Sequence, residues 1–315
     1  MKKKTTGYLF ILLTTLIFST MEVMLRYTRG LFAPMQITYL RFLIGGIALI
    51  PFAVSALKKH EAKLRGRDIA YFALTGFMCV AFSMVMYQMA ILYTSASFVA
   101  VAFSANPVFV TILAALLLKE RIRPYHIIAL VIEVIAIVVI VSPWKNAVDP
   151  KGVILTVAAS LAFALYMVLG KKKTPAFGGI VVTCCSMLMG SLELFCILLI
   201  GRTAGGAAFF EGLGLTIFVN VPLLPALPQE AILPFLYICL INSAAGYVCH
   251  MLALEKTSAS ETNLVYFLKP MLSPIIAFLF LKEVITANMW LGIALFLVGS
   301  AVAVLPGILA VRRSR

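Results

Sequence analysis

Long apolar runs separated by short polar connections make up almost the whole of this sequence. A helix that crosses the hydrocarbon core of a bilayer needs about 20 mainly apolar residues. Ten runs reach that length: 7–27, 34–56, 68–92, 96–118, 124–143, 151–170, 179–201, 231–254, 260–281 and 287–309. Hydrophobic residues make up 63% of the chain and charged residues 12%, against about half and a quarter in soluble domains. We therefore expect an all-α integral membrane protein with ten transmembrane helices.

The connections carry residues that typically end helices. Pro34, Pro124, Asp149-Pro150 and Thr174-Pro175 all stand between apolar runs. The longest connection, 202–230, contains a pair of glycines and three prolines. We expect it to form a loop at the membrane surface, with a re-entrant segment as the alternative.

The formal net charge of +14 comes from short clusters of Lys and Arg between the apolar runs. Such clusters do not build the basic face of a folded domain that nucleic-acid binding needs. With the N-terminus placed in the cytoplasm, 18 Lys and Arg fall on the cytoplasmic side and six on the other. This bias predicts a multi-pass protein of the cell membrane with both termini cytoplasmic. The six Cys lie in apolar runs without metal-ligand spacing, so we expect no metal and no cofactor.

One pattern of residues occurs twice along the chain. Its first copy is Thr94 to Ser97, Pro107 and Glu120, and its second, 163 residues later, is Thr257 to Ser260, Pro270 and Glu283. Earlier in each half, Gly7 and Phe18 match Gly152 and Phe163 at an offset of 145. We therefore expect two five-helix repeats, 1–145 and 146–315. Because five is odd, the second repeat is inverted in the membrane, an architecture typical of secondary transporters with alternating access.

The repeated pattern also resembles a known family. Each copy has an Ala-x-x-x-Thr-Ser-Ala start at Ala90 or Ala253, a Pro within the helix and a closing Lys-Glu, and Arg41-Phe42-Leu43 stands in the second helix. These motifs are similar to those of the EamA-like branch of the drug/metabolite transporter superfamily. The resemblance implies a ten-helix fold, a central cavity lined by helices 1, 3, 4, 6, 8 and 9, and outlying helices 5 and 10 that can carry a homodimer contact. Members move amino acids, carboxylates, amines and other metabolites, so the substrate stays open.

Ionisable side chains within spans are expensive, and each is a candidate for function. Glu22 and Arg41 lie on consecutive helices at matching depth, roughly 10 Å below the outer surface at about 1.5 Å per helical residue. They form either a structural ion pair, or a functional pair that is part of an outer gate or touches the substrate. A pair of Glu22 with Arg26, one turn away, is the other structural interpretation.

Lys269 lies near the expected midplane, on a helix face with Thr262, Tyr266 and Ser273. Its position in the repeat corresponds to Asn106, which also precedes a Pro. We expect Lys269, Tyr266, Ser273 and Asn106 to line the substrate site, where an ammonium group favours anionic or zwitterionic cargo. The alternative is a structural ion pair of Lys269 with Glu133 or Glu193.

Glu193 and Glu133 fall near mid-depth in the seventh and fifth spans. Each is either a proton-coupling carboxylate or half of a buried salt bridge. His250 corresponds to Tyr87 in the repeat and has Tyr247 three residues before it. It is either a substrate or proton group, or a hydrogen-bonded packing residue.

These features predict a secondary transporter, which we expect to export small polar metabolites such as amino acids or carboxylates. The sequence has no nucleotide-binding or catalytic motif, so we do not expect an enzyme. An intramembrane enzyme or lipid-processing protein is the alternative, and it would need its reactive groups in a closed pocket. The expected partners are a small-molecule substrate, the lipid bilayer and a second copy in a homodimer, but no nucleic acid.

Overall fold

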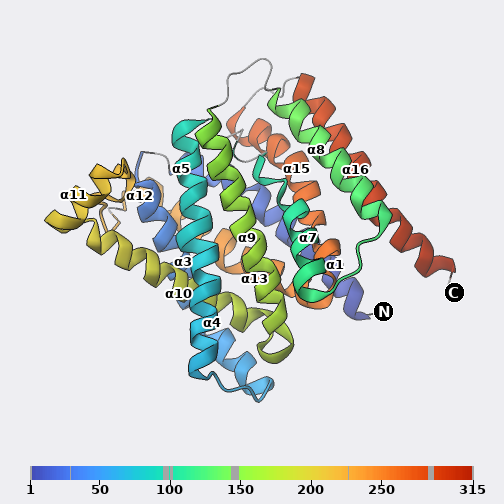
Figure 1. Cartoon of the computed structure of the whole chain (residues 1–315), viewed down its shortest axis with the longest axis horizontal. Coiled ribbons are helices and arrows are strands. Elements are labelled where there is room, and N and C mark those ends of the chain that lie inside the picture. The colour runs from blue at the N-terminus through green and yellow to red at the C-terminus, as the bar shows by residue number, and fades with distance from the viewer. Residues whose placement is uncertain are drawn as a thin grey trace.

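The computed structural model describes residues 2–28, 30–94, 99, 102–142, 149–225, 227–282 and 287–313. This part of the chain is helical almost throughout (Figure 1). The elements are α1 (Lys2–Ser19), α2 (Met21–Tyr27), α3 (Pro34–Lys59), α4 (Gly66–Gly76), η1 (Phe77–Met84), α5 (Val85–Tyr93), α7 (Asn106–Leu118), α8 (Pro124–Val141), α9 (Pro150–Phe177), α10 (Gly179–Ile200), α11 (Ala204–Gly212), η2 (Thr216–Phe218), α12 (Gln229–Leu236), η3 (Tyr237–Ala245), α13 (Gly246–Lys256), α14 (Ala259–Thr262), α15 (Leu264–Leu281) and α16 (Ala287–Arg313).

Six helical segments of the described chain are long and apolar enough to cross a membrane. They are Lys4–Leu25, Pro34–Lys59, Gly66–Tyr93, Pro150–Phe177, Gly179–Ile200 and Gln229–Lys256. Shorter apolar helices lie at Asn106–Leu118, Pro124–Val139, Leu264–Phe280 and Trp290–Gly299. The prediction of an all-α, multi-pass membrane protein is therefore confirmed, and the count of ten spans stays a prediction.

Most of the predicted helix ends are observed. Pro34, Pro124 and Pro150 each occupy the first turn of a helix, where a missing backbone N–H costs nothing. The Asp149 side chain accepts a hydrogen bond from the Lys151 backbone N–H at 2.8 Å and caps α9. The expected end at Pro175 is wrong, because α9 continues through it and stops only at Gly178, whose φ of 77° ends the helix.

Three predicted spans are interrupted among the described residues, and the long connection is partly helical. The span 96–118 turns at residues 104 and 105, just before α7 begins. The span 7–27 breaks at Thr20, whose hydroxyl bonds the Ile17 carbonyl at 2.7 Å and the Tyr237 hydroxyl at 3.1 Å. The span 260–281 breaks at Asn263, whose amide donates to the Thr111 hydroxyl at 3.1 Å. Within 202–230 the chain forms α11 and η2 in place of a plain loop.

The helices of the two halves pack in reciprocal pairs. Helix α1 packs against α13 and α15, and α9 packs in the same way against α5 and α7. Helices α3 and α10 contact each other near the centre. Helices α8 and α16 lie side by side along one flank, and α11 lies at the opposite flank (Figure 1).

Small residues let these pairs approach closely. A Cβ on Gly7 would meet the Thr257 methyl group, and a Cβ on Gly152 would lie 2.8 Å from the Thr94 methyl group. Thr257 and Thr94 are extended and end α13 and α5. The same two residue types therefore meet in both halves, at the offsets of 145 and 163 found in the sequence.

The third helix of each half contains a π-helical segment, η1 in the first and η3 in the second. Each lies beside the second helix of the other half: η3 beside α3, and η1 beside α10. π-helical turns add a residue to the helical turn and are frequent at functional sites. Both segments lie beside the centre of the molecule, where the candidate site is found.

Candidate functional site

A cluster of aromatic rings surrounds His250 at the centre of the helical bundle. The imidazole lies 5.8 Å from the rings of Phe18 and Tyr266 and 6.4 Å from Phe163, measured between ring centroids. Tyr247, one turn earlier on α13, lies 5.3 Å from Phe18 and 6.0 Å from Phe163. These five residues, which we call the ring cluster, come from α1, α9, α13 and α15, and all are buried.

His250 is the polar group of this cluster with unused hydrogen-bonding capacity. Its exposed fraction is 1%, and neither ring nitrogen has a hydrogen-bond partner among the described residues. A neutral imidazole offers one donor and one acceptor. The donor and the acceptor of its ring are therefore unused by the described residues. Both interpretations from sequence, a substrate or proton group and a packing residue, stay predictions.

Asn106 is also buried near these rings. Its side-chain nitrogen donates to the Ser160 carbonyl at 2.7 Å and lies 3.3 Å from the Ser160 hydroxyl. Its side-chain oxygen has no partner in the described structure. Asn106 thus ties the start of α7 to α9 and keeps one acceptor available.

The residues predicted on the ninth span lie on α15. The Tyr266 hydroxyl points to the Met167 sulfur at 3.8 Å, and the Ser273 hydroxyl lies 3.4 Å from the Ser19 carbonyl oxygen of α1. Lys269, between them, is half-buried. The polar stripe therefore faces α1 and α9, although Thr262 belongs to α14 and not to the same helix.

Arg41 is almost completely buried on α3, with an exposed fraction of 2%. Its terminal nitrogens point to the sulfur atoms of Met84 at 3.2 Å and Met21 at 3.5 Å. The guanidinium carbon lies 4.6 Å from the centre of the Phe42 ring, and Phe42 packs on Tyr247 at 5.3 Å. Arg41 therefore borders the ring cluster.

The three membrane carboxylates occupy other places. Glu22 lies on α2, and its side chain falls outside the described residues, so its pairing with Arg41 stays a prediction. Glu193 is half-buried on α10, and Glu133 is fully buried on α8. Both oxygens of Glu133, and one of Glu193, have no hydrogen-bond partner in the described part of the chain.

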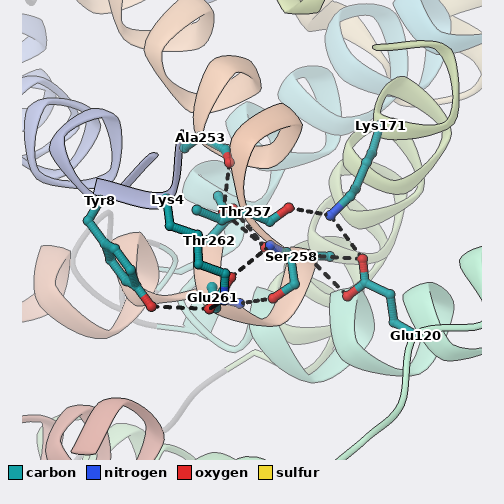
Figure 2. Close-up of polar contacts among 10 residues, drawn as sticks. Lys4, Tyr8, Glu120, Lys171, Ala253, Thr257, Ser258, Glu261 and Thr262 are labelled. Atoms are coloured by element: carbon teal, nitrogen blue, oxygen red, sulfur yellow. Dashed lines mark hydrogen bonds and ion pairs between the residues drawn. The ribbon is translucent and has the colours of Figure 1, made fainter. Parts of the chain in front are cut away.

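A second polar group of residues links α1, α9 and α14 to the segment that follows α7 (Figure 2). The Glu261 carboxylate accepts hydrogen bonds from Lys4 and Tyr8 of α1, each at 3.1 Å. It also accepts one from the Ser258 backbone N–H at 3.0 Å, and the Ser258 hydroxyl caps α14 in return. Lys4 and Tyr8 belong to the first half of the chain and Glu261 to the second, so these contacts join the halves.

The neighbouring part of this network is centred on Glu120, which follows α7. Lys171 of α9 forms a 2.9 Å ion pair with Glu120 and also donates to the Thr257 carbonyl at 2.9 Å. The carboxylate accepts in addition from the Ala259 backbone N–H at 3.1 and 3.2 Å. Figure 2 shows the two carboxylates on either side of the chain segment that joins α13 to α14. We call the residues Lys4, Tyr8, Glu120, Lys171, Ser258 and Glu261 the end network.

Opposing effects act on the Glu261 carboxyl, which lies in α14, outside the apolar helix Leu264–Phe280. Burial favours its neutral form, but hydrogen bonds from Ser258, Lys4 and Tyr8 stabilise the carboxylate. Their sum lowers the pKa of Glu261 below its ordinary value. Glu261 is therefore ionised at neutral pH and holds Lys4 by charge. Among the residues that the structure describes, no group of three or more His, Cys, Asp or Glu could hold a metal ion.

Sequence reasoning missed most of the end network and part of the ring cluster. The repeat marked Phe18, Phe163 and Glu120 only as matching positions. Lys4 and Lys171 entered the sequence analysis only in the count of positive charges that predicts which side is cytoplasmic. Their contacts join residues up to 257 positions apart. The repeat was the available signal, because it marks the positions at which the two halves meet.

Comparison with known proteins agrees with this architecture. The profile of the EamA-like transporter family matches residues 5–142 and, a second time, residues 150–305. A Clostridium kluyveri protein named "uncharacterized transporter" is 34% identical over 304 residues, which cover 94% of this chain and 92% of that protein. A Streptantibioticus cattleyicolor protein named "probable terminal-alkyne amino-acid exporter" is 23% identical over 245 residues, 76% of this chain and 74% of that one. One solved structure shares the fold, with a TM-score of 0.73 and 16% identity over 96% of this chain and 97% of that chain.

Proposed function

Because the chain belongs to the EamA-like transporter family, we propose that it is a secondary transporter that exports small polar metabolites by alternating access. Two inverted five-helix halves, 1–145 and 146–315, rock around a central site in this mechanism. In this proposal, the six long and four shorter apolar helices of the described chain are the ten spans.

The observation that carries this proposal is the reciprocal packing of the halves around buried, unpartnered polar atoms. Helix α1 packs on α13 and α15 as α9 packs on α5 and α7. The double match of the family profile supports the same division of the chain. Between the halves lie His250 and Asn106, each with unsatisfied hydrogen-bonding atoms. A bound polar solute would satisfy those atoms, which are costly to leave unpaired in a low-dielectric interior.

The substrate class follows from the groups at this site. A neutral His, an Asn acceptor and aromatic rings suit a small solute with both polar and apolar parts, and Lys269 favours a negative group on it. Amino acids and related carboxylates have this chemistry. The relative named as an amino-acid exporter supports the same class.

The end network acts as the gate of the cytoplasmic side in this proposal, and both termini lie in the cytoplasm. The excess of Lys and Arg on the connections of that side supports this orientation. The ion pairs Lys4–Glu261 and Lys171–Glu120 join opposite halves there. Opening toward the cytoplasm requires both pairs to break.

The test is transport by the purified full-length chain in proteoliposomes, with radiolabelled amino acids and carboxylates and with imposed proton or substrate gradients. We expect uptake or counterflow that stops when the gradient is collapsed. Transport that needs ATP, or chemical conversion of the solute without translocation, would refute the proposal and favour an enzyme.

A further inference from the structure

We propose that Arg41 is the specificity-determining residue of the transporter and binds the carboxylate of its substrate. This inference rests on the proposed transport function and narrows the cargo to small molecules with a carboxylate and an apolar body. It starts from the partners of the guanidinium. Both hydrogen-bond acceptors described for it are thioether sulfurs, Met84 at 3.2 Å and Met21 at 3.5 Å, which are weak acceptors.

The third nitrogen of Arg41, Nε, has no hydrogen-bond partner among the described residues. The neutral groups that interact electrostatically with the guanidinium are the side chains of Tyr247, Tyr87, Cys79 and Cys239. A buried cation surrounded by such groups is poorly stabilised. A planar carboxylate that accepts two parallel N–H bonds is the ligand that a guanidinium fork matches best.

The pseudo-equivalent position in the second half shows that the fold itself does not need this charge. At the offset of 145, Arg41 corresponds to Ser186 and Gly45 to Gly190. A Cβ on Gly45 would lie 3.0 Å from the Cys239 carbonyl oxygen of η3, and one on Gly190 would meet the corresponding carbonyl of Gly76 beside η1. Arg41 and Ser186 therefore occupy equivalent positions in the structure as well as in the sequence repeat.

Ser186 satisfies its site with a neutral hydrogen bond. Its hydroxyl lies 2.7 Å from the hydroxyl of Thr75, and both side chains are buried. The first half carries an arginine at the same place, and its hydrogen-bond and cation–π partners among the described side chains, which do not include that of Glu22, are two sulfur atoms and an aromatic ring. This asymmetry between two otherwise matching packing sites indicates that Arg41 serves a ligand and not the packing of α3.

The surroundings of Arg41 include flexible side chains and both π-helical segments. Met84 lies in η1 and Cys239 in η3, so the two π-helical segments flank the guanidinium. Met side chains are flexible and can move aside as a ligand enters. Tyr247 links Arg41 to the ring cluster, since it packs on Phe42 at 5.3 Å and on Phe18 at 5.3 Å. A carboxylate on Arg41 would place an apolar body against these rings.

The experiment compares acids with their amides, which keep the shape but lose the charge. Thermal unfolding of the detergent-purified full chain is measured with L-leucine, L-phenylalanine, hexanoate and benzoate, each beside its amide. We expect at least one acid, and not its amide, to raise the melting temperature. Arg41→Met should weaken that acid about 10- to 100-fold, the usual effect of losing a charged hydrogen bond. Arg41→Lys should keep part of the affinity. Ser186→Ala, the matched control, should keep the difference between acid and amide.

Three results would overturn the proposal: equal stabilisation by acid and amide, retention of the shift in Arg41→Met, or no shift with any of the four acids. A structural ion pair with Glu22 would also overturn it. That pair predicts that Glu22→Gln and Arg41→Met each lower the melting temperature and that the double variant recovers it. Proteoliposome transport separates the two proposals. If the wild type and Arg41→Met carry a neutral or cationic solute equally well, the proposal for Arg41 is refuted and the transporter proposal stands. If the wild type transports nothing, the transporter proposal is refuted.

Discussion

At the scale of single residues, the centre of the molecule keeps polar atoms that the fold does not use. His250 and Asn106 are buried with atoms that have no hydrogen-bond partner among the described residues. Buried polar groups without partners lower stability, and natural proteins retain such costs mainly where function needs them. The buried polar atoms without hydrogen-bond partners are thus the feature that marks the candidate site.

Lys269 gives the first prediction at this scale. Lys269→Met keeps the length of the side chain and removes a charge from α15, so we expect the melting temperature to stay within a few degrees. If the ammonium holds an anionic substrate group, transport should fall about 10- to 100-fold. Lys269→Arg should restore only part of it, because a planar fork does not replace a point charge. The measurement is counterflow in proteoliposomes beside thermal unfolding of the same preparations.

The structural alternative for Lys269 makes the opposite prediction. In an ion pair, Lys269→Met would strand a carboxylate and lower stability, and Glu133→Gln or Glu193→Gln in the same chain would restore it. Glu133 has no hydrogen-bond partner within the described structure, which weighs against that pair. Normal transport by Lys269→Met would refute the binding role.

At the scale of elements, the ends of helices were predictable and their interruptions were not. Pro34, Pro124 and Asp149 act locally, so the sequence alone marks the starts of α3, α8 and α9. The break at Thr20 depends on Tyr237, which is 217 residues away, and no local pattern contains that contact. The π-helical segments and the ring cluster were missed for the same reason.

The repeat predicted more than the local patterns, because it compares positions that meet in space. Gly7 packs on Thr257, and their counterparts Gly152 and Thr94 pack in the same way.

The second prediction tests the contact between Gly7 and Thr257. Gly7→Ala should destabilise the protein by about 1–3 kcal/mol through overpacking against the Thr257 methyl group. Thr257→Ser removes that methyl group and keeps the hydroxyl, so the double variant should regain most of the loss. Equal melting temperatures for Gly7→Ala and for the double variant Gly7→Ala with Thr257→Ser would contradict the packing of Gly7 on the Thr257 methyl group.

The end network gives a prediction for pH. The pKa of Glu261 is lower in the folded protein than in an exposed Glu, so its contribution to stability is present at neutral pH. That contribution is lost as the pH falls below the ordinary pKa of a Glu carboxyl and through the lowered pKa of Glu261. Glu261→Gln should therefore be less stable than the wild type at pH 7 and should approach it at the acid end. Parallel stability curves for the two proteins from pH 7 to pH 3 would contradict this assignment.

At the scale of the whole molecule, the proposed transport mechanism requires the two halves to move relative to each other. Only such a movement would connect opening of the end network to access to the ring cluster. Two ion pairs join the halves at this end, beside the packing of Gly7 on Thr257. The Lys4 side chain is 64% exposed, whereas those of Lys171 and Glu120 are 17% and 20% exposed. Exposed ion pairs contribute at most about 1 kcal/mol each. The Lys4–Glu261 pair can therefore open and close with a small difference in free energy, as a gate between two populated states requires.

The last prediction concerns a cross-link that holds the end network closed. Lys4→Cys and Glu261→Cys, in a chain whose six native Cys are replaced, put one thiol on each half where the two side chains are 3.1 Å apart. A short reducible reagent that joins the two thiols should abolish transport, and reduction should restore it, because the halves can no longer separate at that end. Joining Lys58→Cys to Arg65→Cys spans a connection within the first half and should leave transport unchanged. If the chain cross-linked between positions 4 and 261 transports at the rate of the reduced protein, the halves do not part there, and the end network is a structural clasp outside the transport cycle.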